Sequence, residues 1–135
     1  MSDCIFCKLV KGEIPSSKVF EDDKTIAFLD IAPVNKGHVL VIPKEHFETI
    51  LDTPEDTLKE VIATTKKVTA AVKKGVNADG ITVGQSNFEA AGQVVPHLHF
   101  HIMPRFKDDG LKLWPQGTYE DKEMDEYKDK IINSM

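Results

Sequence analysis

Three histidines alternate with apolar residues in the run His97-Leu98-His99-Phe100-His101-Ile102-Met103. Successive side chains of a β-strand point to opposite faces of its sheet, so the run predicts a strand over residues 97–104 with the imidazoles on one face and the apolar side chains on the other. The chain has five histidines, and three of them lie here. Because histidine is a rare residue, this strict alternation indicates metal ligation or imidazole chemistry rather than an ordinary polar strand face.

The size and charge of the chain narrow its class. A length of 135 residues suits one hydrophobic core and is too short for two ordinary domains, so we expect a single domain over residues 1–135. The net charge of -5 argues against binding to a nucleic-acid duplex, which requires a basic surface. Neither a signal peptide nor a stretch of about 20 apolar residues is recognisable, and we expect a cytoplasmic protein without a membrane span.

The remaining patterns predict an α+β fold: a mostly antiparallel sheet of about five strands, one long helix and a C-terminal helix. We expect the other strands at residues 19–21, 25–31, 38–43 and 80–86, and helices at 4–11, 53–75 and 121–133. The sequence Asp22-Asp23 supplies turn residues for a hairpin between the first two strands. The segment 38–43 (HVLVIP) is nearly apolar throughout, which predicts a central strand covered on both faces.

The long helix carries signals at both ends. Thr53 is the expected N-cap, Pro54 the first helical residue, and acidic residues follow in the first turn. Lys73-Lys74-Gly75 are expected to close the helix with two cations and a glycine. Spacings of three and four predict one buried stripe, made of Leu58, Val61, Ile62, Thr65, Val68 and Val72.

A row of imidazoles favours nucleophilic catalysis at phosphorus. A neutral imidazole attacks without a separate base, provided that its other nitrogen is oriented by an acceptor and that nearby donors stabilise the phosphate. Flanking histidines two residues away lie about 6–7 Å from the central one in a strand. We therefore expect His99 to be the nucleophile, with His97 and His101 as its orienter and its phosphate donor.

A three-histidine metal site is the competing hypothesis. Zinc accepts three histidines with an open fourth position. However, ligands on consecutive same-face strand positions point nearly parallel and converge poorly on one ion.

Several blocks of the sequence resemble a known family almost end to end. They are CIFCKLVKGEIPSSKVFED, AFLDIAPVNKGHVLVIPKEH, GQVVPHLHFHIMPR and LWPQG. With them, the chain resembles the histidine-triad (HIT) family of nucleotide hydrolases and transferases, in its branch of histidine-triad nucleotide-binding proteins. The third histidine of the signature is His101 and not glutamine, which is similar to the hydrolase branches rather than the nucleotidylyl-transferase branch.

This resemblance implies catalytic roles at matching positions. His99 would attack the α-phosphorus of a nucleoside monophosphate conjugate and form a nucleotidyl-histidine, which water then hydrolyses. The main-chain carbonyl of His97 would orient His99, and His101 would donate to phosphate oxygens. Gln93 would lie near the leaving group and the phosphate. His38 is similar to a family histidine that packs near the triad.

The same resemblance implies a nucleotide-binding pocket. Asp30 would accept hydrogen bonds from both ribose hydroxyls, a role that suits an acceptor-only carboxylate. Apolar residues would wall the base, namely Ile5, Phe6, Leu9, Phe28, Leu29 and Ile31. Taken singly, each of these is an ordinary core residue, and Asp30 an ordinary turn residue. The phosphate would be held by Asn87, Gly92, Gln93, Val94, His99 and His101.

One position departs from the family pattern. Many relatives carry Ser or Thr after the Gly-Gln pair, and their hydroxyl contacts phosphate, whereas this chain has Val94. We expect a weaker phosphate contact and slower turnover, since only the backbone N–H is left as a donor there.

Cys4 and Cys7 have the spacing of a zinc knuckle and need two further ligands. Subfamilies that this sequence resembles bind zinc through such a pair, the His of the I-P-K-x-H segment and the first histidine of the triad. Here these are Cys4, Cys7, His46 and His97, which would make a closed structural zinc site and leave catalysis without a cofactor. Two buried cysteines without metal are the alternative.

Two classes of function stay open. The first is a hydrolase of phosphoramidate-type AMP or GMP conjugates, with a dinucleoside polyphosphate hydrolase as its close variant. The second is a nucleotide-binding or scaffold module with vestigial activity. The resemblance also implies a homodimer in which Trp114 lies near the partner's active site.

Overall fold

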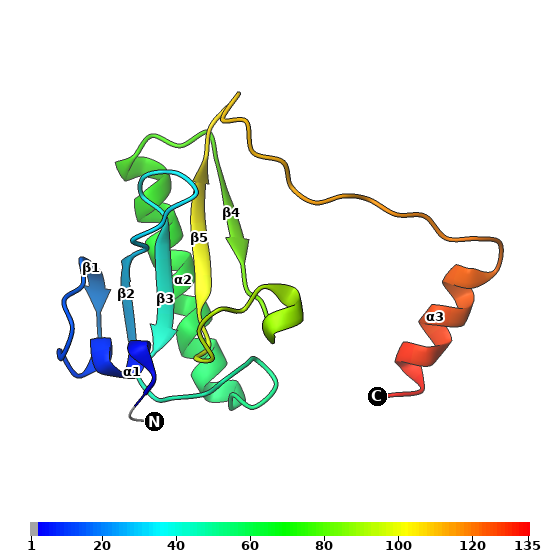
Figure 1. The fold of residues 1–135 in the computed structure, drawn as a ribbon, viewed down its shortest axis with the longest axis horizontal. Helices are drawn as coiled ribbons and strands as arrows, with labels where there is room; N and C mark the ends of the chain where they lie inside the picture. The colour runs from blue at the N-terminus through cyan, green and yellow to red at the C-terminus, as the bar shows by residue number, and fades with distance from the viewer. Residues whose placement is uncertain (1–2) are drawn as a thin grey trace.

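The computed structural model describes residues 3–135 and is built around a five-stranded antiparallel sheet in the order β1-β2-β3-β5-β4 (Figure 1). This confirms the expected α+β fold with an antiparallel sheet, one long helix and a C-terminal helix. The elements are α1 (Ile5–Val10), β1 (Lys18–Glu21), β2 (Thr25–Leu29), β3 (Val39–Pro43), α2 (Glu55–Gly75), β4 (Gly80–Gly84), the 3₁₀ turn η1 (Glu89–Ala91), β5 (Phe100–Arg105) and α3 (Glu123–Ile132).

The expected hairpin between β1 and β2 is confirmed. Oδ1 of Asp22 accepts hydrogen bonds from the backbone N–H of Lys24 at 2.9 Å and of Thr25 at 2.8 Å, and from the Thr25 hydroxyl at 3.0 Å. A short side chain that satisfies several donors at once closes the turn. The two strands then pair antiparallel, with one irregularity between Lys18 and Phe20.

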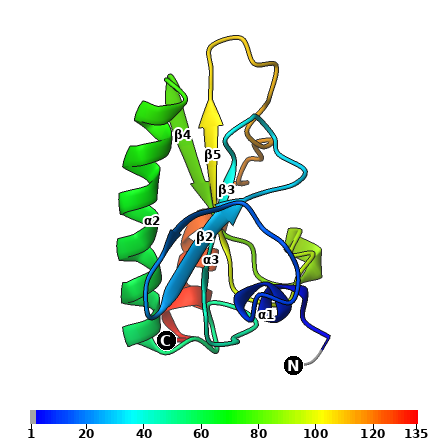
Figure 2. The ribbon, with the colours of Figure 1, turned by 90° about the vertical axis from the view of Figure 1, so that its left-hand side faces the viewer.

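Strand β3 is the central strand, as its apolar sequence predicts, and every residue of it is buried. Val39 and Val41 pack with Ala27 in the cluster beneath α2. Leu40 and Ile42 belong to a second cluster, which includes residues of α1. The two helices cover opposite faces of the sheet (Figure 2), and the alternation of a strand divides β3 between them.

The start of α2 differs from the sequence prediction. Pro54 is the N-cap, and it makes no side-chain cap bond. The hydroxyl of Thr53 donates instead to the carbonyl of Thr49 at 2.6 Å, within the turn that leads into the helix. The cap hydroxyl is therefore used by the preceding loop, and Glu55 and Asp56 support the helix N-terminus by their charge.

The buried face of α2 is largely the predicted one. Val61, Thr65, Val68 and Val72 are buried, whereas Ile62 is half exposed and was wrongly assigned to the stripe. Thr64 is buried in its place, and its hydroxyl lies 2.7 Å from the hydroxyl of Thr25 on β2. The predicted end at Gly75 holds, but the left-handed residue is Asn77, at φ 55°.

Strand β5 begins at Phe100, later than the predicted start at His97. The backbone N–H of Leu98 donates to the carbonyl of Phe47 at 2.7 Å, so the backbone at Leu98 bonds to the loop after β3 and not to a strand. The alternation of faces nevertheless continues through this extended segment. Leu98, Phe100 and Ile102 all lie in the cluster beneath α2, which directs the histidines to the opposite face.

After β5 the chain leaves the sheet as an extended arm that ends in α3 (Figure 1). None of the residues of α3 is buried. The arm begins at a hub formed by Asp109, whose carboxylate accepts from Arg105 Nε at 2.9 Å and from the backbone of Phe106 and Leu111 at 3.0 Å each. Over the residues that the structure describes, no helix is both long and apolar enough to cross a membrane.

Candidate functional site

The two histidines that precede β5 each have one ring nitrogen fixed by a backbone carbonyl. Nδ1 of His99 lies 2.7 Å from the carbonyl oxygen of His97, and Nε2 of His97 lies 2.9 Å from that of Pro43. A carbonyl only accepts, so each of these nitrogens carries the proton. His99 therefore presents the lone pair of Nε2, and His97 that of Nδ1. Burial lowers the pKa of both rings, that of His97 to about 4, so both are neutral at pH 7.

A relay through His38 fixes the tautomer of His101. The backbone N–H of Val34 donates to Nδ1 of His38 at 3.1 Å, so a neutral His38 carries its proton on Nε2. That nitrogen lies 2.9 Å from Nδ1 of His101, which must accept. His101 is thereby left with an N–H at Nε2. Burial and the neighbouring His99 and His38 lower the pKa of His101 to about 4, so it is a neutral donor.

Asp30 lies at the outer end of this relay, just after β2. Its Oδ2 is 3.6 Å from Nε2 of His38, and its Oδ1 accepts from the backbone N–H of Ala32 at 2.8 Å. The backbone N–H of Asp30 donates to the carbonyl of His38 at 2.9 Å. The structure therefore brings Asp30, His38 and His101 together, with the carboxylate only partly exposed.

The expected base wall divides into two groups. Phe6, Leu9 and Phe28 are buried in one apolar cluster, where the ring of Phe6 meets the ring of His99 edge to face at 5.3 Å between centroids. Ile5, Leu29 and Ile31 are exposed, Ile31 completely. Three of the six residues are thus core residues, of which Phe6 borders the histidines, and three offer apolar surface to solvent.

Gln93 and Asn87 connect two loops. The amide nitrogen of Gln93 donates to the carbonyls of Glu48 at 2.6 Å and Val95 at 3.1 Å, and its oxygen accepts from the backbone N–H of Phe88 at 2.7 Å. Oδ1 of Asn87 accepts from the backbone N–H of Ile50 at 2.9 Å. In this structure both side chains hold the loop of residues 44–52 against that of residues 85–93.

Other predicted site residues lie at the surface. Val94 is 88% exposed, beside Gly92 at φ 96°, where open space surrounds the position of a Cβ. A shallow cleft of about 690 Å³ includes Gly92, Gln93 and Val94 in its lining. Trp114 is 70% exposed on the C-terminal arm. Within the described part of this single chain, Trp114 is therefore not buried against the histidines.

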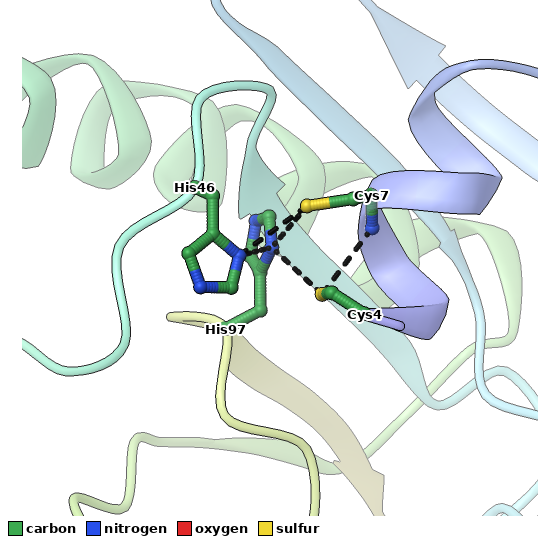
Figure 3. A group of neighbouring side chains, drawn as sticks. All are labelled: Cys4, Cys7, His46 and His97. Atoms are coloured by element: carbon green, nitrogen blue, oxygen red, sulfur yellow. Dashed lines mark hydrogen bonds between the residues drawn. The ribbon is translucent and has the colours of Figure 1, made fainter. Parts of the chain in front are cut away.

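Three further side chains converge with His97 beside the nucleophile candidate, and we call the four the Cys2His2 cluster: Cys4, Cys7, His46 and His97 (Figure 3). Nδ1 of His97 lies 3.5 Å from Sγ of Cys4, 3.7 Å from Sγ of Cys7 and 3.2 Å from Nδ1 of His46. Sγ of Cys7 is 3.3 Å from Nδ1 of His46. Tetrahedral zinc with its usual bond lengths places such ligand atoms roughly 3.3–3.8 Å apart, so the cluster fits this ion.

The protonation of these side chains also suits a bound divalent cation. The proton of His97 is held at Nε2, and the lone pair of Nδ1 faces a second ring nitrogen and two sulfur atoms. Burial raises the pKa of the Cys7 thiol, and the neighbouring Cys4 raises it further. A divalent cation satisfies all four donor atoms at once, and it stabilises the thiolate form of both cysteines.

Sequence reasoning missed the backbone groups that fix these tautomers. The Pro43 carbonyl and the Val34 N–H determine which nitrogen of His97 and of His38 carries the proton. Every residue has such groups, so no sequence signal distinguishes these two. Gln85 was also missed; its amide pairs with that of Asn87 at 2.7 and 3.0 Å.

Comparison with known proteins agrees with this geometry. Residues 11–108 match the HIT domain. The chain belongs to the HIT domain family. It is 44% identical to an uncharacterised HIT-like protein of Methanocaldococcus jannaschii, over 95% of this chain and 98% of that protein. It is 43% identical to a Candida albicans protein named adenosine 5'-monophosphoramidase, over 90% of this chain and 84% of that protein.

Solved structures share the same HIT fold. A HIT family protein of Bacillus subtilis superposes with a TM-score of 0.91 at 36% identity, covering 98% of this chain and 97% of that one. A zinc-bound histidine triad family protein of Mycobacterium smegmatis gives a TM-score of 0.79 at 31% identity, covering 99% of both chains.

Proposed function

We propose that this HIT protein hydrolyses nucleoside monophosphate conjugates of the phosphoramidate type at the α-phosphate, through a nucleotidyl-histidine intermediate on His99. The observation that carries the proposal is the 2.7 Å hydrogen bond from Nδ1 of His99 to the carbonyl of His97, which leaves a lone pair on Nε2 of a neutral ring. The Candida albicans relative named adenosine 5'-monophosphoramidase supports the assignment of the reaction.

In the proposed reaction, Nε2 of His99 attacks the α-phosphorus and the bond from phosphorus to the leaving nitrogen breaks. That nitrogen takes a proton from solvent and leaves as an amine. Positive charge develops on the His99 ring, and the carbonyl of His97 stabilises it through the Nδ1–H. His101 donates its Nε2–H to a non-bridging phosphate oxygen. Water then attacks phosphorus, gives a proton back to solvent, breaks the N–P bond and releases the nucleotide with His99 restored.

The nucleoside moiety is assigned to the side of Asp30. The carboxylate is acceptor-only, so its two oxygens suit the two hydroxyls of a ribose. The apolar surface beside it suits a purine base of AMP or GMP, with Phe6, Leu9, Phe28, Leu29 and Ile31 as the proposed wall. Apolar contacts of this type discriminate between bases by only about 1–3 kcal/mol.

The phosphate is assigned to the loop before the triad. Val94 would offer its backbone N–H group. The N–H of Gly92 already donates to the carbonyl of Glu89 at 2.9 Å, so Gly92 would contribute the open space around its Cα instead. Gln93 and Asn87 would shape that loop through the hydrogen bonds described above. The Gln93 amide would contact the leaving group by giving up one of its hydrogen bonds to the protein when substrate binds. Val94 supplies no hydroxyl, so the bound phosphate has one donor fewer than with Ser or Thr.

A homodimer is part of the proposal. The exposed face of the arm and α3 includes Leu113, Trp114, Tyr127 and Ile131, each between 47% and 70% exposed. Apolar surface of this kind is stabilised when a second copy covers it. Trp114 of one protomer would then lie near the histidines of its partner.

We also propose that the Cys2His2 cluster binds zinc as a closed structural site. All four ligands come from the protein, so no position is left for substrate, and catalysis does not pass through the metal. When bound, zinc would supply a fixed tetrahedral link between the N-terminal helix and the segment that carries the triad.

The test follows release of AMP from adenosine 5'-phosphoramidate and from diadenosine tetraphosphate, with His99→Ala as the control. Fast release from the phosphoramidate that is lost in the variant is the expected result. Preference for diadenosine tetraphosphate would move the assignment to a dinucleoside polyphosphate hydrolase. AMP binding without release from either compound would contradict the proposal and favour a binding module.

A further inference from the structure

Phe88 holds a backbone conformation that costs free energy. Its φ of 73° and ψ of 160° lie in a region that essentially only glycine adopts without strain. Three hydrogen bonds keep it there: its N–H donates to Oε1 of Gln93 at 2.7 Å, and its carbonyl accepts from the backbone N–H of Ala91 and of Gln93 at 3.1 Å each. A glycine at this position would make the same three hydrogen bonds without the strain.

The ring of Phe88 adds nothing to the core in return for this strain. The side chain is 50% exposed and belongs to neither of the two core clusters. It lines the shallow cleft of about 690 Å³ together with two other exposed apolar residues, Val94 and Pro96. Strain that is retained without a gain in packing is typical of functional positions. The ring is therefore suited to contact a ligand in this cleft.

Two carboxylates give the same cleft a negative charge. Glu48 and Glu89 line it from the two loops that the Gln93 side chain holds together, and both are exposed. Among the residues that the structure describes, no lysine or arginine lines the cleft, and neither carboxylate forms an ion pair. Such a cleft attracts an ammonium group and repels a phosphate or a carboxylate.

The cleft lies where the proposed substrate continues beyond its phosphorus. The nucleoside is assigned to Asp30, which adjoins His101 at one end of the histidine row. Gln93 and Val94, assigned to the leaving group and to the phosphate, precede the other end of the row, and both line the cleft. A conjugate that is bound across His99 therefore directs its leaving group toward the cleft.

We propose that this cleft binds the leaving group, and that the leaving group is an organic amine with an apolar chain and a positive charge at its far end. Phe88 contacts the chain, and Glu48 and Glu89 attract the charge. This inference rests on the proposed function and keeps its reaction: the P–N bond breaks, and the amine leaves with a proton from solvent. A leaving polyphosphate, as in diadenosine tetraphosphate, would bring negative charge against both carboxylates.

The experiment measures kcat/KM for adenosine 5'-phosphoramidate and for the AMP phosphoramidates of cadaverine, hexylamine and aminopentanoate. The last three have chains of similar length that end in a positive, a neutral and a negative group. Glu48→Gln, Glu89→Gln and Phe88→Gly are compared with the wild type. Phe88→Tyr is the control that keeps a ring. Glu60→Gln removes an exposed carboxylate of α2, which covers the face of the sheet opposite to the histidines (Figure 2).

In the wild type, we expect kcat/KM to be about 3- to 10-fold higher for the cadaverine conjugate than for the hexylamine conjugate, and lower by a similar factor for the aminopentanoate conjugate. Glu48→Gln and Glu89→Gln should each reduce these ratios, whereas Glu60→Gln should keep them.

The ring of Phe88 has its own readouts. Phe88→Gly should lower kcat/KM for all three long conjugates about 3- to 10-fold relative to adenosine 5'-phosphoramidate, because the contact with the chain is lost, and Phe88→Tyr should not. Phe88→Gly should also keep or raise the midpoint of urea denaturation, because glycine adopts a φ of 73° freely.

Equal kcat/KM for the three long conjugates would overturn the inference, as would ratios that persist in both glutamine variants. A lowered urea midpoint in Phe88→Gly would show a packing residue, and loss of a dimer by that variant in ultracentrifugation would show a partner chain in the cleft; either result would overturn it. If no compound releases AMP, the dissociation constants of His99→Ala for the same compounds decide. The same order of affinity would mean that the proposed function fails and the cleft stands, and equal affinities would overturn both.

Discussion

His97 and His101 lie at the two ends of one alternating row, yet their surroundings give them different tasks. Both rings are neutral, with burial lowering each pKa to about 4. His97 is enclosed by two cysteines and a histidine, and a backbone carbonyl holds its proton. His101 is partly exposed, and another side chain, His38, fixes its proton. The alternation of the sequence therefore determines on which face of the sheet the histidines lie, while the residues around each histidine determine its chemical role.

Removal of the His99 side chain, which lies between His97 and His101, should have the largest effect on kcat. We expect His99→Ala to lower kcat for adenosine 5'-phosphoramidate by at least about 10³-fold, since the nucleophile is lost. Zinc binding should be unchanged, because His99 is no ligand of the cluster. Rapid-quench trapping of labelled nucleotide on the protein checks the first point and metal analysis the second. A variant that still accumulates labelled protein would contradict the role of His99.

Zinc binding at the His97 end of the histidine row should raise the stability of the fold. Zinc at about 1,000 times its dissociation constant should raise the free energy of unfolding by about 4 kcal/mol, because only the folded chain assembles all four ligands. Urea denaturation with and without zinc measures this difference. Cys7→Ser should lose it, whereas His99→Ala should keep it. Equal stabilisation of Cys7→Ser would show that zinc binds elsewhere.

At the other end of the row, kcat should depend on the hydrogen bond from His38 that fixes the tautomer of His101. We expect His38→Leu to lower kcat about 10-fold, because His101 then distributes its proton between both nitrogens and offers the Nε2 donor only part of the time. Comparison with His101→Gln, which places an amide donor at that position, separates loss of the donor from loss of its orientation. An unchanged kcat in His38→Leu would remove the relay from the mechanism.

Acid should lower the stability of the metal-free protein through His97 and His101. The pKa values of His97 and His101 are lowered from 6.5 to about 4 in the folded protein, so the unfolded chain binds more protons between these values. The free energy of unfolding of the metal-free protein should therefore fall as the pH drops from about 6.5 to about 4, and change little from these groups above 6.5. Denaturation at several pH values measures the slope, which His101→Gln should reduce. A slope equal to that of the wild type would contradict the lowered pKa of His101.

The smallest change concerns the loop before the row. Val94→Ser should raise kcat/KM about 2- to 5-fold, since a neutral hydrogen bond at this exposed position should contribute about 0.5–1 kcal/mol. Val94 is exposed, so the fold should tolerate the change. Val94→Ala is the control for loss of the apolar side chain. A serine variant that is no faster than the alanine variant would show that no hydroxyl reaches the phosphate.

Sequence patterns predicted the elements of the fold well, because local spacing sets them. The central position of β3, the Asp22 turn and most of the buried face of α2 followed from short-range patterns. The predictions that were wrong depended on distant contacts. Thr53 does not cap α2, because the loop at Thr49 uses its hydroxyl, and β5 starts late, because Leu98 bonds to Phe47.

The candidate site divides in the same way. The imidazole row was visible in the alternation, and the set Cys4, Cys7, His46 and His97 came from family resemblance; the structure brings each group together. The resemblance implied that the His97 carbonyl orients His99, as the structure has it. The tautomers of His97 and His38 were not predictable, since they depend on single carbonyl and N–H groups that any sequence would supply. The engagement of Gln93 with Glu48 was equally hidden, because it joins residues 45 positions apart.

The pairing of β3 with β5 has a consequence for the order of folding. Val41 on β3 faces Phe100 on β5, so helix α2 and β4 lie between the two partners along the chain. Closing so large a loop costs more conformational entropy than closing the hairpin of β1 and β2. We therefore expect the N-terminal strands to form early and the histidine segment to dock in the last step. Until β5 docks, partially folded chains would expose the unpaired edge of β3 to other molecules, and the nucleophile His99 would not yet be in place.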